Sequence, residues 1–422
     1  MNKNLNFAAI IKKLNDTGLF HIFGASVINK IMNFLCSIVV VRIVSKAAFG
    51  EYTYANNIVS LVLLLSGLGL ASGTFQLCSE EINNRKKQID IYNYGCSLGI
   101  KFNLLLSIII ILASVVGNLK IKESEDLLLL MAFYPVIYVV FEFQQNYLRS
   151  TLNNKKYSLG TTINTVLVVI FSICGALLYQ IKGLIFGTYV AYILTIIIVF
   201  CAFKAPVKLI KQKLDKSTKI TLIKLSLISM CNNGLSQLLY LADTFLLGLI
   251  LADENIIASY KVATVIPNAM TFIPLSVITY VYPYFAMNRT DKVWTKKKYK
   301  LLLKVMLVGN LFISGILFIF AEQIISLVYG VNYLDAVPCF KILAISYFFS
   351  GSFRIVSGNL LVTQRKVGFN LFVAIISGLL NILGNIVFIP LYGSVGAAMV
   401  TLMIVIFTSL VSTLYYTHVI KK

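Results

Sequence analysis

The chain has few charged residues, and acidic ones are the scarcest. Charged residues make up 13% of its 422 positions, with 16 Asp and Glu against 37 Lys and Arg. A soluble domain averages about 25% charged residues. A water-soluble fold with this composition would lack the polar groups needed to cover its surface. The composition therefore argues against a soluble enzyme, a disordered protein and a collagen-like protein.

Histidines and paired cysteines, the usual ligands of a structural metal, are also scarce. There are two histidines, both near the ends of apolar segments, and none of the seven cysteines forms a Cys-x-x-Cys pair. All cysteines except Cys78 lie inside apolar runs. This pattern argues against a disulfide framework or a zinc site and predicts small, buried, apolar side chains. We therefore expect no metal site and no bound cofactor.

What the chain does contain is long apolar runs. Hydrophobic residues make up 58% of it and the mean hydropathy is +0.85. A helix that crosses a bilayer needs about 20 mostly apolar residues. The sequence predicts an all-α integral membrane protein with twelve such helices. Their predicted ranges are 17–43, 49–75, 91–117, 126–148, 158–179, 183–203, 220–247, 256–285, 299–320, 337–361, 368–389 and 393–417.

The lysines and arginines between these spans predict the orientation of the chain. If the N-terminus is cytoplasmic, 25 of them fall on the inner side and 5 on the outer side. Cytoplasmic loops carry the excess of basic residues, so we expect both termini inside. The net charge of +21 then reflects topology and attraction to anionic membrane lipids, and not nucleic-acid binding.

The ends and loops of the chain bear on processing and on enzymatic activity. The first 16 residues are polar and charged, and no small-residue cleavage site follows a short apolar core, so we expect no cleaved signal peptide. The longest predicted loop, residues 204–219, is too short for a folded catalytic domain outside the bilayer. We therefore expect a protein that is not an enzyme.

The second half of the chain echoes the first. The segment that follows span one, with Tyr52, matches the segment that follows span seven, with Tyr260. Glycines also begin the last span of each half. Because each half has six spans, the halves have the same orientation, as in transporters built from parallel repeats. We predict an N-terminal lobe (1–203), a basic cytoplasmic linker (204–219) and a C-terminal lobe (220–422).

Several polar residues lie in the middle of apolar spans, where a lysine or arginine costs about 2.5–3.5 kcal/mol. Lys30 and Asn33 share one helical face of span one, and similar polar stripes occur in spans seven and eleven. Such stripes indicate a wet cavity or hydrogen bonds between helices. The predicted cavity residues are Lys30, Asn33, Lys101, Glu142, Asn233, Arg354 and Asn381.

Two alternatives stay open for the charged members of this set. Glu142 and Arg354 lie in spans that correspond in the two halves, so they are candidates for a pair across the lobes or for a structural ion pair. Lys101 is long enough to extend its amine toward the membrane surface. Four more charged residues lie toward the outer ends of spans and are predicted either to form an outer gate or to be ordinary interfacial charges. These are Arg42, Glu51, Asp243 and Lys261.

Three motifs give the chain a resemblance to a known family. Between the first two predicted spans, Arg42 is followed by Phe49, Gly50 and Tyr52, as Arg and Phe-Gly-x-Tyr. A polar loop with Gln364, Arg365 and Lys366 precedes span eleven, and a turn that begins at Pro390 precedes span twelve. In these motifs the chain resembles the polysaccharide flippase branch of the multidrug/oligosaccharidyl-lipid/polysaccharide exporter superfamily.

The resemblance implies a function. Members of that branch move undecaprenyl-diphosphate-linked oligosaccharide repeat units from the inner to the outer leaflet of the bacterial plasma membrane, for O-antigen, capsule or exopolysaccharide assembly. The implied partners are the lipid-linked oligosaccharide, membrane lipids, and the polysaccharide polymerase and chain-length machinery. The cavity residues suit this cargo, because lysine and arginine would offset the desolvation of a diphosphate.

Other functions are compatible with the same sequence. A multidrug antiporter of the same superfamily would favour buried acidic residues, which are few here. A membrane-embedded glycan polymerase or ligase usually needs a large outer loop, and the outer loops here are short. A scaffold for the assembly complex also stays open. Coupling to H⁺ or Na⁺ is a further possibility, with Glu142 and Asp243 as candidate sites.

Overall fold

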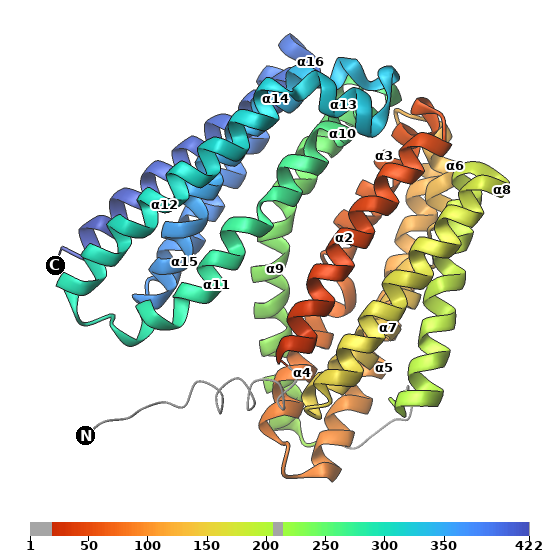
Figure 1. Ribbon diagram of the computed structural model, residues 1–422. Coiled ribbons are helices and arrows are strands. Elements are labelled where there is room, and N and C mark those ends of the chain that lie inside the picture. Colours follow the sequence, from red (N-terminus) through yellow and green to blue (C-terminus); the bar gives the residue numbers. More distant parts are fainter. Residues whose placement is uncertain (1–18, 206–213, 422) are drawn as a thin grey trace. The chain divides into compact units, whose positions relative to one another are not determined.

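The computed structural model describes residues 19–205 and 214–421, and across those residues the chain is helical and has no strand (Figure 1). The first half contains α2 (Leu19–Ile43), α3 (Lys46–Leu63), η1 (Ser66–Gly69), α4 (Leu70–Glu80), α5 (Arg85–Val116), α6 (Glu123–Leu130), α7 (Tyr134–Ser150) and α8 (Asn154–Phe203). The second half contains α9 (Lys216–Leu251), α10 (Glu254–Met270), α11 (Phe272–Met287), α12 (Lys292–Ile319), α13 (Ala321–Tyr329), η2 (Val331–Ala336), α14 (Val337–Phe349), η3 (Ser350–Arg354), α15 (Ile355–Thr363) and α16 (Val367–Val419).

Length and composition make this a multi-pass membrane protein. Within the described residues, nine helical segments are long and apolar enough to cross a bilayer, and α9 contributes a shorter apolar stretch, Leu241–Leu251. Two of the nine, Asn154–Phe203 and Gly368–Val419, are about twice the length that a single crossing requires. The predicted all-α class is therefore confirmed.

Both of these long helices turn back on themselves. In α8 the backbone leaves helical geometry at Tyr179 and Gln180, and in α16 it does so at Gly393. A Cβ added to Gly183 would lie 2.0 Å from the carbonyl oxygen of Gly175, so the two halves of α8 touch backbone to backbone. A Cβ at Gly396 would likewise lie 2.2 Å from the carbonyl oxygen of Phe388. Each long helix is thus a tight helical hairpin, which bends where the sequence analysis placed the boundary between two spans.

The described residues form two compact units. The first holds residues 19–45, 58–205 and 214–234, and the second holds residues 46–57 and 235–421. Helices α3 and α9 are therefore each shared, with one part in each unit. The units differ from the predicted lobes in two places, because 46–57 packs with the later residues and 220–234 packs with the earlier ones.

The start of α3 belongs to the second unit through several close contacts. The Lys46 ammonium forms a salt bridge with Asp335 at 2.7 Å, and the Ser259 hydroxyl donates to the same carboxylate at 2.8 Å. A Cβ at Gly50 would lie 1.8 Å from the carbonyl oxygen of Glu254, so only glycine permits this approach. Further along, the Asn57 amide donates to the carbonyl oxygen of Leu241 at 3.1 Å.

In the first unit, the span that begins with α3 is broken before α4. Gly67, Leu68 and Gly69 have positive φ angles of 54°, 51° and 71°, and η1 replaces a turn of α-helix there. The buried Asn103 side chain of α5 links this break to α7, because it accepts from the Gly67 amide at 2.6 Å and donates to the Pro135 carbonyl at 2.6 Å. A buried cluster that includes Tyr92, Phe143 and Leu148 then packs α4, α5 and α7 together.

The second unit has its own core. Helices α12, α14, α15 and α16 lie side by side there (Figure 1). Tyr299 of α12 and Tyr416 of α16 are buried against each other, with ring centroids 4.6 Å apart, and Leu360 of α15 completes the cluster. Burial of such side chains contributes about 1.5–3 kcal/mol each. This core supports the helices that form the site described next.

Candidate functional site

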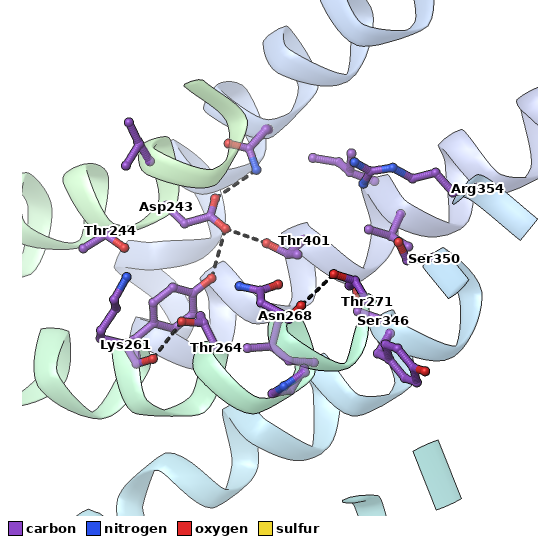
Figure 2. Close-up of a pocket in the computed structure, with 18 residues that line it drawn as sticks. Asp243, Thr244, Lys261, Thr264, Asn268, Thr271, Ser346, Ser350, Arg354 and Thr401 are labelled. Atoms are coloured by element: carbon purple, nitrogen blue, oxygen red, sulfur yellow. Dashed lines mark hydrogen bonds between the residues drawn. The ribbon is translucent and has the colours of Figure 1, made fainter. Parts of the chain in front are cut away.

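A pocket of about 210 Å³ opens within the second unit (Figure 2). Helices α9, α10, α14 and α16 line it together with η3. Hydroxyl, amide and charged groups make up much of its wall. The polar and charged lining residues are Asp243, Thr244, Tyr260, Lys261, Thr264, Asn268, Thr271, Ser346, Tyr347, Ser350, Arg354, Asn381 and Thr401.

The pocket contains one buried carboxyl group, that of Asp243, a residue that is 7% exposed. Its Oδ1 accepts hydrogen bonds from the Asn381 and Asn385 amides at 2.9 and 2.7 Å. Its Oδ2 accepts from the Tyr260 hydroxyl at 2.9 Å and from Thr401 Oγ1 at 2.6 Å. All four donors are uncharged, and they come from α10 and from both arms of the α16 hairpin. The α16 hairpin thus brings Asn381 and Thr401 to one carboxyl group.

One oxygen of this network lacks a donor. The Asn385 Oδ1 atom is buried and has no hydrogen-bond partner among the described residues. A buried polar atom without a partner costs about 1–3 kcal/mol. Carboxylate and amide oxygens are the ligands that hard cations prefer, and a carboxyl group is also a site for a proton. The network around Asp243 is chemically suited to bind a small cation or a proton.

Two cationic side chains contribute to the same pocket from different elements. Lys261 comes from α10, where Thr264, Asn268 and Thr271 follow it on one helical face. Arg354 comes from η3, a single π-helical turn between α14 and α15. Such turns insert one extra residue and often occur at functional sites. In Figure 2, Lys261 and Arg354 lie on opposite sides of the view, with Asp243 and Thr401 between them.

The structure thus brings together four residues that the sequence analysis divided between two sites. Arg354 and Asn381 were predicted for the cavity, and Asp243 and Lys261 for the outer gate. All four line one pocket of the second unit. The carboxyl group of Asp243 is held by uncharged donors, which is a different environment from the ion pairs expected of a gate.

The remaining predicted residues lie elsewhere. In the first unit, Lys30 and Asn33 are exposed on α2 and Glu142 is half-buried on α7. Lys101 is exposed on α5, on the face that also carries the exposed Leu105 and Ile108. That face is apolar, as expected for a lysine that extends along lipid toward the membrane surface.

Of the predicted gate residues outside the pocket, Arg42 is exposed on α2 in the first unit, and Glu51 is half-buried in the 46–57 segment of the second unit. The side chain of Asn233 is outside the described residues. Glu142 and Arg354 belong to different units, so their predicted pairing stays a prediction.

Sequence reasoning missed three members of the pocket that periodicity alone would have found. Thr264, Asn268 and Thr271 follow Lys261 at spacings of three, four and three, which is one face of a helix. Thr401 carried no such signal, because it is a single hydroxyl in an apolar run. Its role depends on the α16 hairpin, which places it beside Asn381.

The fold and the site define a multi-pass membrane protein with a polar, charged pocket inside one helical unit. Comparison with known families then identifies it more closely. The chain belongs to the family described as "Polysaccharide biosynthesis protein", which it matches over residues 39–338. The resemblance predicted from the Arg42–Tyr52 motif is therefore confirmed. A comparison with curated protein sequences gives no match.

Solved structures with a similar fold are those of membrane transporters and flippases. The lipid II flippase MurJ in an inward closed conformation matches with a TM-score of 0.73 and 16% identity, over 95% of this chain and 87% of its own. A multidrug resistance MATE family transporter of the MOP superfamily, in an inward-facing conformation, matches with a TM-score of 0.71 and 14% identity, over 93% and 94%.

A third similar structure is a MOP superfamily transporter from Pyrococcus furiosus, described as having a binding pocket of reverse polarity. It matches with a TM-score of 0.58 and 12% identity, over 96% of this chain and 94% of its own. At these identities the three likenesses establish the shared fold.

Proposed function

We propose that this protein is a flippase that moves undecaprenyl-diphosphate-linked oligosaccharide repeat units from the inner to the outer leaflet of a bacterial plasma membrane. The observation that carries the proposal is the pocket of the second unit, where Lys261 and Arg354 accompany a wall of hydroxyl and amide groups. A sugar diphosphate is anionic and rich in hydroxyls, so cationic side chains would bind its phosphates and hydroxyl and amide groups would bind its sugar. Membership of a polysaccharide biosynthesis family supports the same cargo.

The proposal includes an arrangement in the membrane. Counting each helical hairpin as two crossings and adding α9 to the nine long segments gives twelve crossings, six in each half of the chain. The matching glycine contacts of the α8 and α16 hairpins support a parallel repeat of six spans. Alternating access between two such halves would carry the head group across, while the polyprenyl tail stays in lipid. Both termini are then cytoplasmic, and the polysaccharide polymerase and chain-length machinery are the expected partners.

Coupling to a cation gradient is the second part of the proposal. Asp243 is the better of the two candidate sites, because it combines deep burial with four neutral donors and the unpartnered Asn385 oxygen. Binding of H⁺ or Na⁺ there would change the charge of a pocket that also holds Lys261 and Arg354. We expect Asp243→Asn to abolish any dependence of transport on the coupling ion.

A strain that lacks the gene tests the proposed cargo. We expect it to accumulate diphosphate-linked oligosaccharide and to lose the surface polymer, and mass spectrometry of the lipid then identifies the sugars. Complementation with Arg354→Ala or Lys261→Ala should restore at most about a tenth of the polymer, because a charge-assisted contact contributes about 1.5–3 kcal/mol. Lys300→Ala, on the exposed face of α12, is the matched control and should restore it fully.

Other outcomes of this experiment contradict the proposal. Normal polymer without accumulated lipid contradicts the flippase function. Full activity of both Lys261→Ala and Arg354→Ala contradicts the binding of the diphosphate by the cations of this pocket. Unpolymerised units at the cell surface would instead indicate a polymerase or ligase.

One observation favours a second candidate function, export of cationic drugs. Asp243 is a buried acidic residue inside one helical unit, which suits a cation as cargo as well as a coupling ion. Drug resistance upon overexpression that disappears in Asp243→Asn would support an antiporter. Drug resistance that does not change upon overexpression would exclude the antiporter function.

A further inference from the structure

The first unit carries a cluster of aromatic rings that the proposed function does not use. Tyr134, Tyr138 and Phe141 lie on α7, and Tyr189 and Tyr192 lie on the second arm of α8, which runs beside α7 (Figure 1). The Tyr192 ring lies 5.6 Å from Tyr134, 6.4 Å from Tyr138 and 5.4 Å from Phe141, between ring centroids. The Tyr134 hydroxyl donates to that of Tyr192 at 3.2 Å. We refer to these five residues as the tyrosine cluster.

The tyrosine cluster is neither core nor an ordinary lipid-facing surface. All five side chains are half-buried, whereas the core aromatics of this unit, such as Tyr92 and Phe143, are buried. The exposed face of the same α8 arm carries Phe186 and Ile193, as lipid contact requires.

A belt of interfacial tyrosines does not account for the cluster either. From Tyr134 to Gln145 the polar and aromatic stripe of α7 covers three turns, roughly 16 Å, which is about half the thickness of the hydrocarbon core. Tyrosines that anchor a protein at the membrane surface occupy only the headgroup level.

Two buried amide side chains, one on α7 and one on α8, have polar atoms without a hydrogen-bond partner among the described residues. Gln145 is 5% exposed, and neither its Oε1 nor its Nε2 has a hydrogen-bond partner among the described residues. Asn164 of α8 is 8% exposed and its Oδ1 is likewise unpartnered. Glu142 lies one turn beyond Tyr138 on the same helical face. Buried amide groups in native proteins are nearly always hydrogen-bonded, so these residues indicate a ligand that supplies donors and acceptors.

The combination of aromatic rings, neutral amides and a carboxylate matches one class of ligand. A pyranose ring has an apolar C–H face that stacks on an aromatic ring and a rim of hydroxyls that bond to amides and carboxylates. A polyprenyl chain offers no hydrogen bonds to the amides. A diphosphate would be repelled by Glu142, and the tyrosine cluster supplies no cation to hold it.

We propose that the tyrosine cluster, with Glu142, Gln145 and Asn164, is a carbohydrate subsite that stacks the sugar rings of the transported lipid. This inference rests on the proposed function, because it assigns the glycan part of that cargo to the first unit. It makes the tyrosine cluster a determinant of which oligosaccharide is accepted.

Binding to the purified full-length protein in nanodiscs tests this subsite with two probes. One is the lipid-linked oligosaccharide extracted from the deletion strain, and the other is undecaprenyl diphosphate without sugar. We expect the wild type to bind the first at least tenfold more tightly. The double variant Tyr138→Leu/Tyr192→Leu should lose this preference and bind undecaprenyl diphosphate as the wild type does. Tyr138→Phe/Tyr192→Phe, which keeps both rings, should retain most of it.

The matched control is Tyr280→Leu, which removes a ring from the exposed tyrosine pair of α11 in the second unit. It should leave both affinities unchanged, and size-exclusion chromatography shows that each variant is folded. A reporter adds a direct readout: in a Trp294→Phe background, Tyr192→Trp should change its fluorescence with the glycosylated probe and not with undecaprenyl diphosphate. Trp294 is the one tryptophan of the chain.

Each remaining outcome overturns one specific claim. If the wild type binds neither probe, the proposed function is wrong. Three other results would leave the proposed cargo intact and show that the carbohydrate subsite is wrong. The wild type could bind both probes equally, the leucine variant could keep its preference for the glycosylated probe, or the leucine variant could lose affinity for both probes alike. If tetraphenylphosphonium competes with the glycosylated probe and its own binding is lost in the leucine variant, the tyrosine cluster is a site for organic cations.

Discussion

At the scale of single residues, the Asp243 carboxyl group organises the pocket of the second unit. Its four donors reach it from α10 and from both arms of α16. A hydrogen bond to a charged group contributes about 1.5–3 kcal/mol, and a buried donor left without an acceptor costs about 1–3 kcal/mol. Removal of the acceptor of such a network should therefore lower the stability of the protein more than removal of any one donor.

The first prediction compares this acceptor with one donor. Asp243→Ala removes the acceptor of four hydrogen bonds, so we expect it to lower the thermal unfolding midpoint in detergent by several degrees. Tyr260→Phe removes a single donor and should destabilise by about 1–2 kcal/mol. Thr264→Val is the control, because that hydroxyl bonds the backbone carbonyl of Lys261 within its own helix. Equal midpoints for Asp243→Ala and Thr264→Val would show that the network does not hold the helices together.

At the scale of elements, the two helical hairpins depend on glycine at the contact between their arms. Gly175 and Gly183 of α8 approach each other with no room for a Cβ atom, and Gly396 of α16 does the same against Phe388. Close packing through small residues is a common way for membrane helices to associate. The arms of each hairpin are therefore fixed by backbone contact rather than by large side chains.

A pair of alanine substitutions measures this dependence. Gly183→Ala places a methyl group 2.0 Å from a carbonyl oxygen, so we expect destabilisation by about 1–3 kcal/mol, as for other overpacked sites. Gly315→Ala in α12 has no atom within 4 Å of its added Cβ. It should be neutral or stabilising by up to about 1 kcal/mol, because alanine is the better helix former. The thermal unfolding midpoints of the two variants, measured side by side, test this expectation. A lower midpoint for Gly315→Ala than for Gly183→Ala would contradict tight packing of the hairpin.

Much of the helical layout was predictable, because apolar length and turn position are local properties. The boundaries placed near residues 180 and 393 coincide with the bends of α8 and α16. The break at Gly67 was not predictable, since its glycines lie among leucines and depend on Asn103, a residue far along the chain. Charged residues inside apolar spans pointed to Asp243, Lys261 and Arg354. Periodicity gives the face of one helix and not its neighbours, so it could not tell that these three share a pocket.

At the scale of the whole molecule, the distribution of basic residues predicts the orientation, and labelling tests it. In a cysteine-free background, Asn118→Cys lies between α5 and α6 and Asn153→Cys lies between α7 and α8. With both termini cytoplasmic, a membrane-impermeant maleimide should label Cys at position 118 in intact cells. Position 153 should react only after the membrane is permeabilised. The opposite pattern would reverse the orientation, and labelling of both positions would contradict the predicted span between them.

The division of α3 and α9 between the two units has a consequence for biosynthesis. Lys46 is synthesised early, yet its partner Asp335 follows 289 residues later. During translation the 46–57 segment therefore enters the membrane long before its permanent neighbours are synthesised. These neighbours include Glu254, which contacts Gly50, and Gly248, which contacts Tyr54. Neither unit can be completed by a nascent chain that stops at the predicted linker. Final assembly is thus a late event that follows membrane insertion. Until the second half of the chain is made, the 46–57 segment must be kept in the membrane by other, temporary contacts.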